Sequence, residues 1–120
     1  MAEDINSNAL EYYFSEEKCF ITELSNSIDD PELSIARARV EPGISTSWHR
    51  LRKITERYCI LSGKGLVEIG KSHSKQVEPG DVILIPPMSR QRITNTGTED
   101  LIFLAICSPR FIEESYELLE

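Results

Sequence analysis

Two short motifs, separated by a segment rich in β-branched residues, constrain the fold of this chain more than any other feature. In the first motif a histidine and a glutamate lie between two glycines, in the order Gly43, His49, Glu56 and Gly63. The second motif runs from a glycine through an apolar stretch and a proline to an asparagine, in the order Gly80, Pro86 and Asn95. Glycine and proline mark tight turns, so the chain across both motifs is expected to run as short strands joined by turns.

Short alternating or apolar segments continue this pattern outside the motifs. The predicted strands are Cys19–Leu24, Ser34–Glu41, Trp48–Leu51, Glu56–Leu61, Leu66–Ile69, Lys75–Val77, Val82–Ile85, Arg90–Thr94 and Leu101–Ser108. Val82–Ile85 is apolar throughout, which predicts a strand buried on both faces. Leu10–Phe14 fits either a short helix or a strand, and Phe111–Leu119 predicts a helical turn. Many short strands with Gly and Pro turns are typical of a β-sandwich or a β-barrel.

The spacing of the two motifs resembles that of the cupin superfamily, G-x5-H-x-H-x3,4-E-x6-G followed by G-x5-P-x-G-x2-H-x3-N. All the motif residues named above fall on family positions, whereas three other positions differ. Leu51 replaces the second histidine, Met88 the glycine after the proline, and Gln91 the last histidine. The resemblance implies an all-β fold, the double-stranded β-helix or jelly-roll barrel. It points to small single-domain cupins of the mannose-6-phosphate-isomerase-like kind.

A chain of 120 residues is expected to form one domain with a core of its own. On the resemblance, residues 33–108 form the cupin barrel. Residues 1–32 are an N-terminal extension that adds one strand, and residues 109–120 are a C-terminal tail.

The alternation of side chains along a strand predicts which residues point into the barrel. If Glu56 points inward, so do Tyr58 and Ile60. If His49 points inward, so does Leu51, and in the second motif Gln91 and Ile93 share one face. The predicted inward polar residues are His49, Glu56, Tyr58 and Gln91. Polar groups that converge on an apolar wall are typical of a small-ligand pocket.

Most metal-binding cupins hold a divalent ion through three histidines and one glutamate. The resemblance carries ligand roles onto His49 and Glu56 alone. Leu51 has no donor atom, and the amide oxygen of Gln91 is a weaker ligand than imidazole for transition metals. A divalent ion (Zn, Mn, Fe or Ni) held by His49, Glu56 and Gln91 is therefore one open alternative.

Three functions remain open from the sequence. The leading hypothesis is a binding module that holds a small polar or anionic molecule through His49, Glu56, Tyr58 and Gln91, with Arg52 folding over the opening. The second is a metal-dependent oxygenase or isomerase that uses His49, Glu56 and Gln91, so whether the protein is an enzyme stays undecided. The third is a dimeric structural barrel without a ligand.

The charge distribution and the lack of targeting signals limit the binding partners and cellular locations that we expect. The formal net charge is −7, yet residues 1–32 carry nine acids and one lysine while residues 33–110 carry seven acids and twelve Lys and Arg. Acidic ends that compete for the basic middle argue against nucleic-acid binding, and they are expected to pack against it. The sequence has no apolar run of membrane-spanning length and no basic, apolar leader at its start, and its three cysteines do not suggest a disulfide scaffold. A cytoplasmic location without a membrane partner is therefore the expectation.

Outward-facing apolar residues predict a homodimer. By the same alternation Trp48, Cys59 and Leu61 lie on the outside of the barrel, and exposed apolar groups of this kind usually mark an interface. Cys59 then lies on the opposite face from Glu56, which argues against a Cys–His nucleophilic pair with His49.

Overall fold

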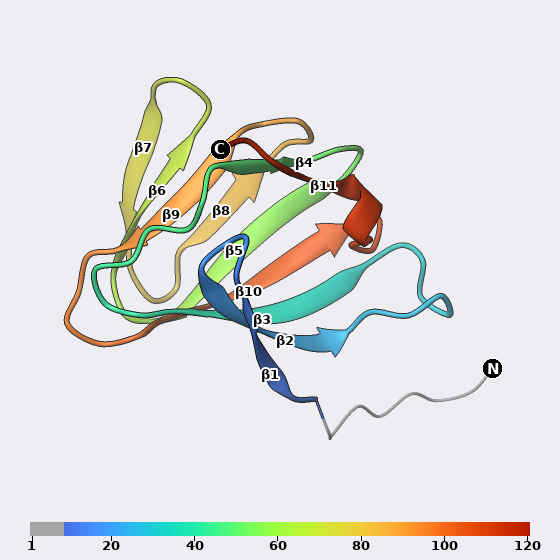
Figure 1. Ribbon diagram of the computed structural model, residues 1–120, viewed down its shortest axis with the longest axis horizontal. Helices are drawn as coiled ribbons and strands as arrows, with labels where there is room; N and C mark the ends of the chain where they lie inside the picture. Colours follow the sequence, from blue (N-terminus) through green and yellow to red (C-terminus); the bar gives the residue numbers. More distant parts are fainter. Residues whose placement is uncertain (1–8) are drawn as a thin grey trace.

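The computed structural model describes residues 9–120, which form two antiparallel sheets facing each other (Figure 1). The six-stranded sheet has the order β1-β2-β3-β10-β5-β8 and comprises β1 (Glu11–Phe14), β2 (Cys19–Ser25), β3 (Ser34–Val40), β10 (Leu101–Ser108), β5 (Thr55–Ser62) and β8 (Val82–Ile85). The five-stranded sheet has the order β11-β4-β9-β6-β7 and comprises β11 (Tyr116–Leu118), β4 (His49–Leu51), β9 (Gln91–Asn95), β6 (Gly65–Ile69) and β7 (His73–Val77). The predicted all-β jelly-roll fold is confirmed.

The core lies between the two sheets and consists of side chains from their inner faces. Its largest fully buried hydrophobic members include Tyr58, Ile60, Ile93, Leu101 and Phe103. They alternate with less buried residues along β5, β9 and β10, as expected where one face of each strand meets the core. The inward set predicted from alternation is buried throughout: His49, Leu51, Glu56, Tyr58, Ile60, Gln91 and Ile93.

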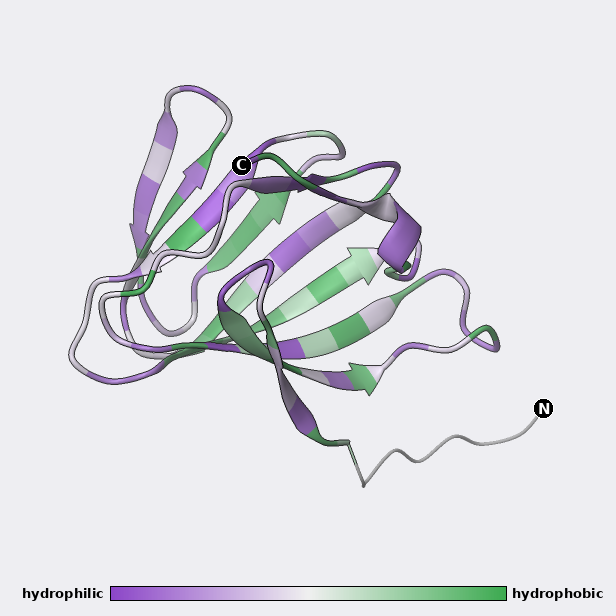
Figure 2. Cartoon of the chain, in the orientation of Figure 1, coloured by the Kyte–Doolittle hydropathy of each residue, from purple (hydrophilic) through white to green (hydrophobic). Residues whose placement is uncertain are grey.

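Strand β8 differs from its prediction. Ile83 and Ile85 are buried, but Val82 and Leu84 are 65% and 60% exposed. The reason is position, because β8 is the edge strand of its sheet and the outer face of that sheet is uncovered there. Figure 2 shows β8 hydrophobic along its length, whereas β7, the edge strand of the other sheet, is mostly hydrophilic.

Both ends of the chain form more strand than the sequence suggested. The N-terminal extension contributes two strands, β1 and β2, which pair as a hairpin, where one was expected. At the C-terminal end the helical segment is one short 3-10 turn, Glu113–Ser115, and the chain then pairs as β11 with β4. Each added strand finds hydrogen-bonding partners at a sheet edge, and such pairing outweighs weak local propensity.

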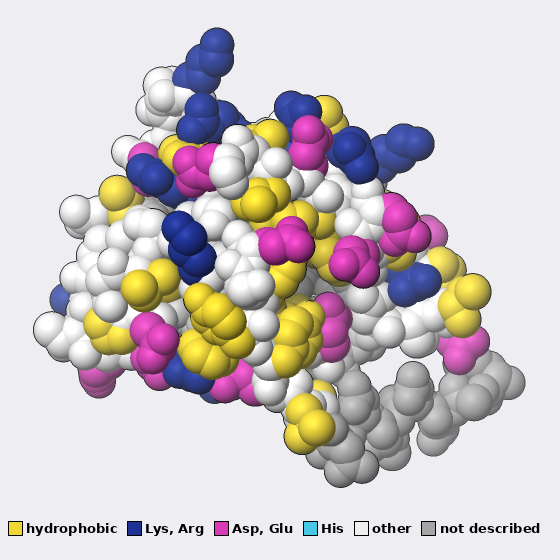
Figure 3. Space-filling view, in the orientation of Figure 1, with side chains coloured by type: hydrophobic (Ala, Val, Ile, Leu, Met, Phe, Trp, Pro, Cys, Tyr) yellow, Lys and Arg dark blue, Asp and Glu magenta, His cyan; other side chains and the backbone are white. Residues whose placement is uncertain are grey.

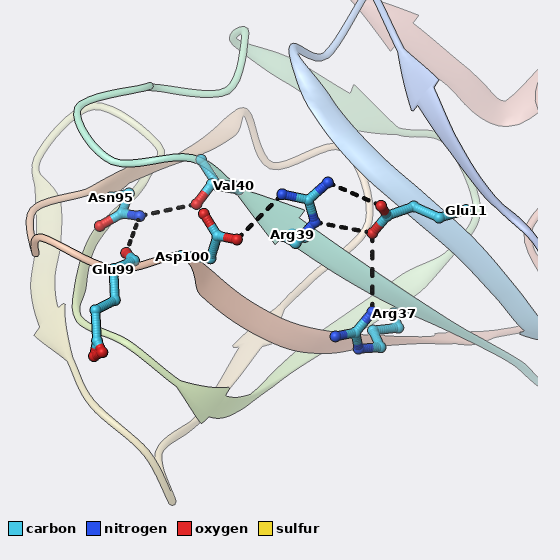
Figure 4. A network of polar contacts seen from close by, with 7 residues as sticks. All are labelled: Glu11, Arg37, Arg39, Val40, Asn95, Glu99 and Asp100. Carbon is cyan, nitrogen blue, oxygen red and sulfur yellow. Dashed lines mark hydrogen bonds and ion pairs between the residues drawn. The ribbon is translucent and has the colours of Figure 1, made fainter.

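Two motif residues act on the backbone rather than on a ligand. At Gly63 a Cβ atom would lie 2.6 Å from the carbonyl oxygen of Asp100, so the turn after β5 has room only for glycine. Asn95 donates from Nδ2 to the carbonyl oxygens of Val40 and Glu99, at 2.8 Å each (Figure 4). These bonds hold the loop between β9 and β10 against the end of β3.

The acidic ends pack against the basic barrel, as the charge distribution suggested. Glu11 in β1 accepts from Arg39 in β3 at 2.8 and 3.0 Å, and Arg39 also donates to Asp100 at 3.1 Å (Figure 4). At the other end Glu117 in β11 accepts from Arg50 in β4 at 2.9 Å. These ion pairs hold the two terminal strands to the barrel.

Among residues 9–120 no helix has the length and apolar character needed to cross a membrane.

Candidate functional site

His49 lies in β4 opposite Gln91 of β9, with its imidazole fully enclosed. Its Nδ1 is 2.7 Å from the carbonyl oxygen of Ser47. A carbonyl oxygen can only accept, so Nδ1 carries a hydrogen and donates it. The other ring nitrogen, Nε2, lies 3.6 Å from Oε1 of Glu17. The ring itself stacks on Tyr116 with centroids 5.2 Å apart.

Glu56 lies in β5 with its carboxyl group buried in the barrel. Oε2 accepts from the Cys107 thiol at 3.8 Å, whereas Oε1 has no hydrogen-bond partner. Burial raises the pKa of Glu56 to about 7; attraction to His49 offsets part of this rise, and Glu17 adds to it. A carboxyl group with that pKa exists in both protonation states near neutral pH.

Tyr58 and Gln91 form a buried pair next to Glu56. The Tyr58 hydroxyl donates to Oε1 of Gln91 at 2.5 Å. Burial raises the pKa of Tyr58 well above its ordinary value, so the phenol stays protonated and remains a donor. The Tyr58 ring packs on Phe103 with centroids 4.5 Å apart. Gln91 therefore fixes Tyr58 and uses its own amide oxygen to do so.

A cavity of about 70 Å³ lies beside these residues. His49, Glu56 and Tyr58 line it from the barrel, and the N-terminal hairpin and the C-terminal segment supply further walls. The hairpin contributes Tyr12, Phe14, Glu17, Ile21 and Glu23, and the C-terminal segment contributes Phe111 and Tyr116. No lysine or arginine is among the lining residues described. The wall is mainly apolar with a few polar groups, the usual make-up of a small-molecule site.

Of the residues predicted to hold a ligand, three line the cavity and two do not. His49, Glu56 and Tyr58 are lining residues. Gln91 is not a lining residue: it accepts from the Tyr58 hydroxyl, and its interaction with Glu56 lowers the pKa of that carboxyl group. Arg52 does not fold over the opening: half exposed, it donates to the backbone oxygen of Glu114 at 2.6 Å and pairs with Glu117. Its guanidinium is thus held on the outside of the barrel by the C-terminal segment.

Glu17 is the site residue that sequence reasoning missed. It lies in the turn between β1 and β2, and its carbonyl oxygen accepts from the Ser47 amide at 3.2 Å. This contact sets the turn against the segment that leads into His49, and Figure 1 shows the turn reaching toward β4 and β11. No motif covers the turn, and alternation within the barrel strands cannot predict what a separate hairpin brings to them.

The residues present do not fit a tightly held divalent metal ion. Leu51 is buried where the family pattern has a second histidine, and it offers no donor. The amide oxygen of Gln91 is already engaged by Tyr58. Across residues 9–120, no three His, Cys, Asp or Glu side chains are arranged to hold a metal ion. A tight site needs three or more such ligands converging on one point.

Comparison with known proteins identifies the family. The cupin domain model matches residues 36–107. This chain belongs to the cupin family. The match covers the barrel from β3 to β10 and leaves the β1–β2 hairpin and β11 outside it.

Individual relatives of this cupin agree with that assignment. An uncharacterized protein of Methanocaldococcus jannaschii is 33% identical over 110 residues, which span 90% of this chain and 87% of that protein. The glucose-6-phosphate isomerase of Pyrococcus horikoshii is 40% identical over 63 residues, but these span 49% of this chain and only 33% of the enzyme.

Solved structures share the fold of this cupin at low identity. Streptomyces Pac13, a nucleoside dehydratase, has a TM-score of 0.81 at 17% identity, over 100% of this chain and 92% of that chain. KdgF from a Halomonas species has a TM-score of 0.76 at 16% identity, over 92% of this chain and 96% of that chain. At such identities the likeness concerns the fold.

Proposed function

We propose that this cupin binds a small polar molecule in the barrel cavity, with His49 and Glu56 as its direct contacts. Tyr58 forms part of the wall, and Gln91 supports the site by holding the Tyr58 hydroxyl. A ligand that fits about 70 Å³ is small. A barrel serving only as a scaffold gains nothing from leaving such a space between polar groups.

The single observation that carries this proposal is that Oε1 of Glu56, a residue that lines the cavity, is buried without a hydrogen-bond partner. A buried polar atom left unpaired costs about 1–3 kcal/mol. A ligand with a hydroxyl or amino group would remove this cost by donating to Oε1. The nearby imidazole of His49 offers a second polar contact for the same molecule.

A thermal-shift screen tests the proposal. Wild type and His49→Ala are compared against a panel of small polar compounds that includes uridine and glucose 6-phosphate. Uridine is present in structures of Pac13 variants, and glucose 6-phosphate is the substrate named for the archaeal isomerases. We expect at least one neutral or positively charged compound to stabilise the wild type and not the variant. His73→Ala, on exposed β7, is the control.

An anionic ligand is disfavoured, in contrast to the alternative that the sequence left open. The lining has three glutamates and no lysine or arginine among the residues described. Glucose 6-phosphate is therefore expected to give no shift. Identical responses of wild type and His49→Ala across the whole panel would count decisively against binding in this cavity.

One observation favours a second function, acid–base catalysis on the bound molecule. A pKa of about 7 lets Glu56 both release and accept a proton near neutral pH, which suits a general acid or base. The test is proton NMR of the panel compounds in D2O with a small, substoichiometric amount of the protein. Exchange of a carbon-bound hydrogen by wild type and not by Glu56→Gln supports catalysis, and equal exchange rates contradict it.

A metal-dependent oxygenase or isomerase has weaker support, because the donor set described above does not fit a tight ion. Elemental analysis of protein purified without chelator separates this alternative from the others. We expect substoichiometric Zn, Mn, Fe and Ni. One equivalent of any of them, lost in His49→Ala, would favour the metal enzyme.

A further inference from the structure

The ionisable groups around the cavity are mainly carboxyl groups. Glu17, Glu23 and Glu56 line it, and His49 is the one basic side chain among the lining residues described. On the face seen in Figure 3, acidic and hydrophobic side chains lie together over the middle of the molecule, and most lysines and arginines lie in the upper half. A bound anion would meet these carboxyl groups without a compensating guanidinium or ammonium group.

Carboxyl groups supply many of the hydrogen-bond acceptors among the lining side chains. Nδ1 of His49 donates to the carbonyl oxygen of Ser47, which leaves Nε2 as the ring nitrogen on the side of Glu17. Nε2 lies 3.6 Å from the carboxylate oxygen of Glu17, too far for a direct hydrogen bond. Oε1 of Glu56 is a further acceptor without a partner. The Tyr116 hydroxyl is also buried and unpaired, so a complementary ligand brings donors for the carboxyl oxygens and can accept one hydrogen bond from this phenol.

An ammonium group supplies both the donors and the charge. An ammonium nitrogen placed about 2.9 Å from Oε1 of Glu17 donates a charge-assisted hydrogen bond to that carboxylate, and the other donors of the compound are available to Oε1 of Glu56. Phe14 and Tyr116 also line the cavity, with ring centroids 5.2 Å apart. Aromatic rings beside carboxylates are a favourable setting for an organic cation.

A bare metal ion is a poorer occupant than an organic cation. No three His, Cys, Asp or Glu side chains within residues 9–120 are arranged to hold an ion. A polyatomic cation does not need such convergence, because its donors reach acceptors that lie apart and its carbon atoms contact the apolar wall.

We propose that the cavity selects a small organic ammonium compound, and that Glu17 from the β1–β2 turn determines this selectivity. The inference rests on the binding function proposed above and adds the chemical class of the ligand. Glu17 lies outside residues 36–107, where the chain matches the family. The barrel then provides a general polar pocket, and the added hairpin decides which charge it accepts.

The test uses three probes of similar size and different charge: ethanolamine, ethylene glycol and glycolate. Each is titrated into the full chain, and binding is followed by backbone amide NMR. Ethanolamine is expected to bind most tightly and to shift the amides around His49 and the β1–β2 turn. Glu17→Gln should weaken ethanolamine binding about tenfold, the cost of one lost charge-assisted contact. Glu16→Gln, the same change at the exposed neighbouring residue, should leave it unaltered.

The outcomes separate this inference from the proposed function. If glycolate or ethylene glycol binds as tightly as ethanolamine, and this binding is lost in His49→Ala, the proposed selectivity for a cation is wrong but the proposed binding in the cavity stands. Saturable Zn²⁺ binding that competes with ethanolamine and is lost in Glu17→Gln would overturn the proposed organic cation in favour of a metal ion. No response to any probe, together with no His49-dependent response in the wider panel, would contradict both the proposed ligand binding and the proposed cation selectivity. The probe comparison on wild type does not depend on whether Glu17→Gln folds.

Discussion

At the scale of single residues, Glu56 combines a structural cost with the proposed binding role. Its pKa of about 7 compares with an ordinary value of 4.5, and desolvation is the main cause. Between these two pH values the unfolded chain releases this proton before the folded protein does. The contribution of Glu56 to stability is therefore complete below pH 4.5 and falls as pH rises to about 7, by about 3 kcal/mol in all.

Glu56→Gln is expected to remove this pH dependence. The variant should match wild type near pH 4.5 and should exceed it by up to about 3 kcal/mol in unfolding free energy at alkaline pH. Urea denaturation across the pH range measures the effect. The exposed Glu99→Gln is the control for loss of one carboxyl group. Parallel pH profiles of wild type and Glu56→Gln would contradict the prediction.

Met88 occupies a backbone conformation that favours glycine. Its φ angle is +67°, and the cupin pattern has glycine at this position. The side chain is 47% exposed, so little packing is lost on its removal. Met88→Gly should raise the unfolding free energy by roughly 0.5–1 kcal/mol, because relief of left-handed strain exceeds the added flexibility of the unfolded chain.

Chemical denaturation measures that gain. Ser89→Gly is the matched control, since the neighbouring residue does not have a positive φ angle. There glycine should be neutral or destabilising. A loss of stability in Met88→Gly as large as in the control would show that the left-handed backbone is not strained.

At the scale of elements, the β1–β2 hairpin matters because it carries Glu17 to the barrel. Arg39 holds β1 through two bonds to Glu11, and it is itself fixed by a bond to Asp100 (Figure 4). Its guanidinium also lies 4.1 Å from the centre of the Phe20 ring in β2. A network of this kind stabilises more than an isolated surface pair. The contacts that hold the hairpin on the barrel therefore also keep Glu17 at the cavity.

Arg39→Ala should loosen this hairpin. We expect a loss of about 1 kcal/mol, seen as faster amide hydrogen exchange in Glu11–Phe14, and a smaller difference from wild type at high salt. Arg37→Ala is the control, since Arg37 makes only a 3.9 Å contact with Glu11. Equal exchange rates in the two variants would show that Arg39 does not hold β1 in place.

At the scale of the whole molecule, the exposed apolar surface on β5 and β8 supports the expected homodimer. Val82, Leu84 and Leu61 are all strongly exposed, and β5 and β8 are neighbouring strands. Trp48 was also expected to lie in the dimer interface, but it is half-buried. Arg90 and Arg92 cover its ring, with guanidinium carbons 3.7 and 4.5 Å from the ring centre. A second copy is therefore expected to cover β8 rather than the indole.

Leu84→Glu should prevent the expected dimer from forming, because a carboxylate cannot be buried unpaired in an apolar interface. Light scattering coupled to size exclusion measures the mass. Ile28→Glu, at a residue 80% exposed in a loop, should leave the dimer intact. A monomeric wild type at all concentrations would contradict the expectation.

Much of the barrel could be predicted because its signals are local. Turn residues mark the strand ends, and alternation assigns the inward face of each strand. Alternation correctly predicted that His49, Glu56 and Gln91 are buried. The exposed face of β8 could not be predicted, since the sequence of an apolar strand does not show whether that strand lies at the edge or at the centre of a sheet. Pairing of β11 with β4 depends on a sheet edge distant in sequence.

The sequence by itself determined the cupin barrel, its motif turns and the inward position of His49, Glu56 and Tyr58, because strand alternation follows from backbone geometry. Only the tertiary structure decided the character of the site. It brought Glu17 to His49 on a separate hairpin, engaged Gln91 with Tyr58 and kept Arg52 outside. The physical reason is that burial and electrostatics depend on which distant segments meet, and no local pattern in the chain records those meetings.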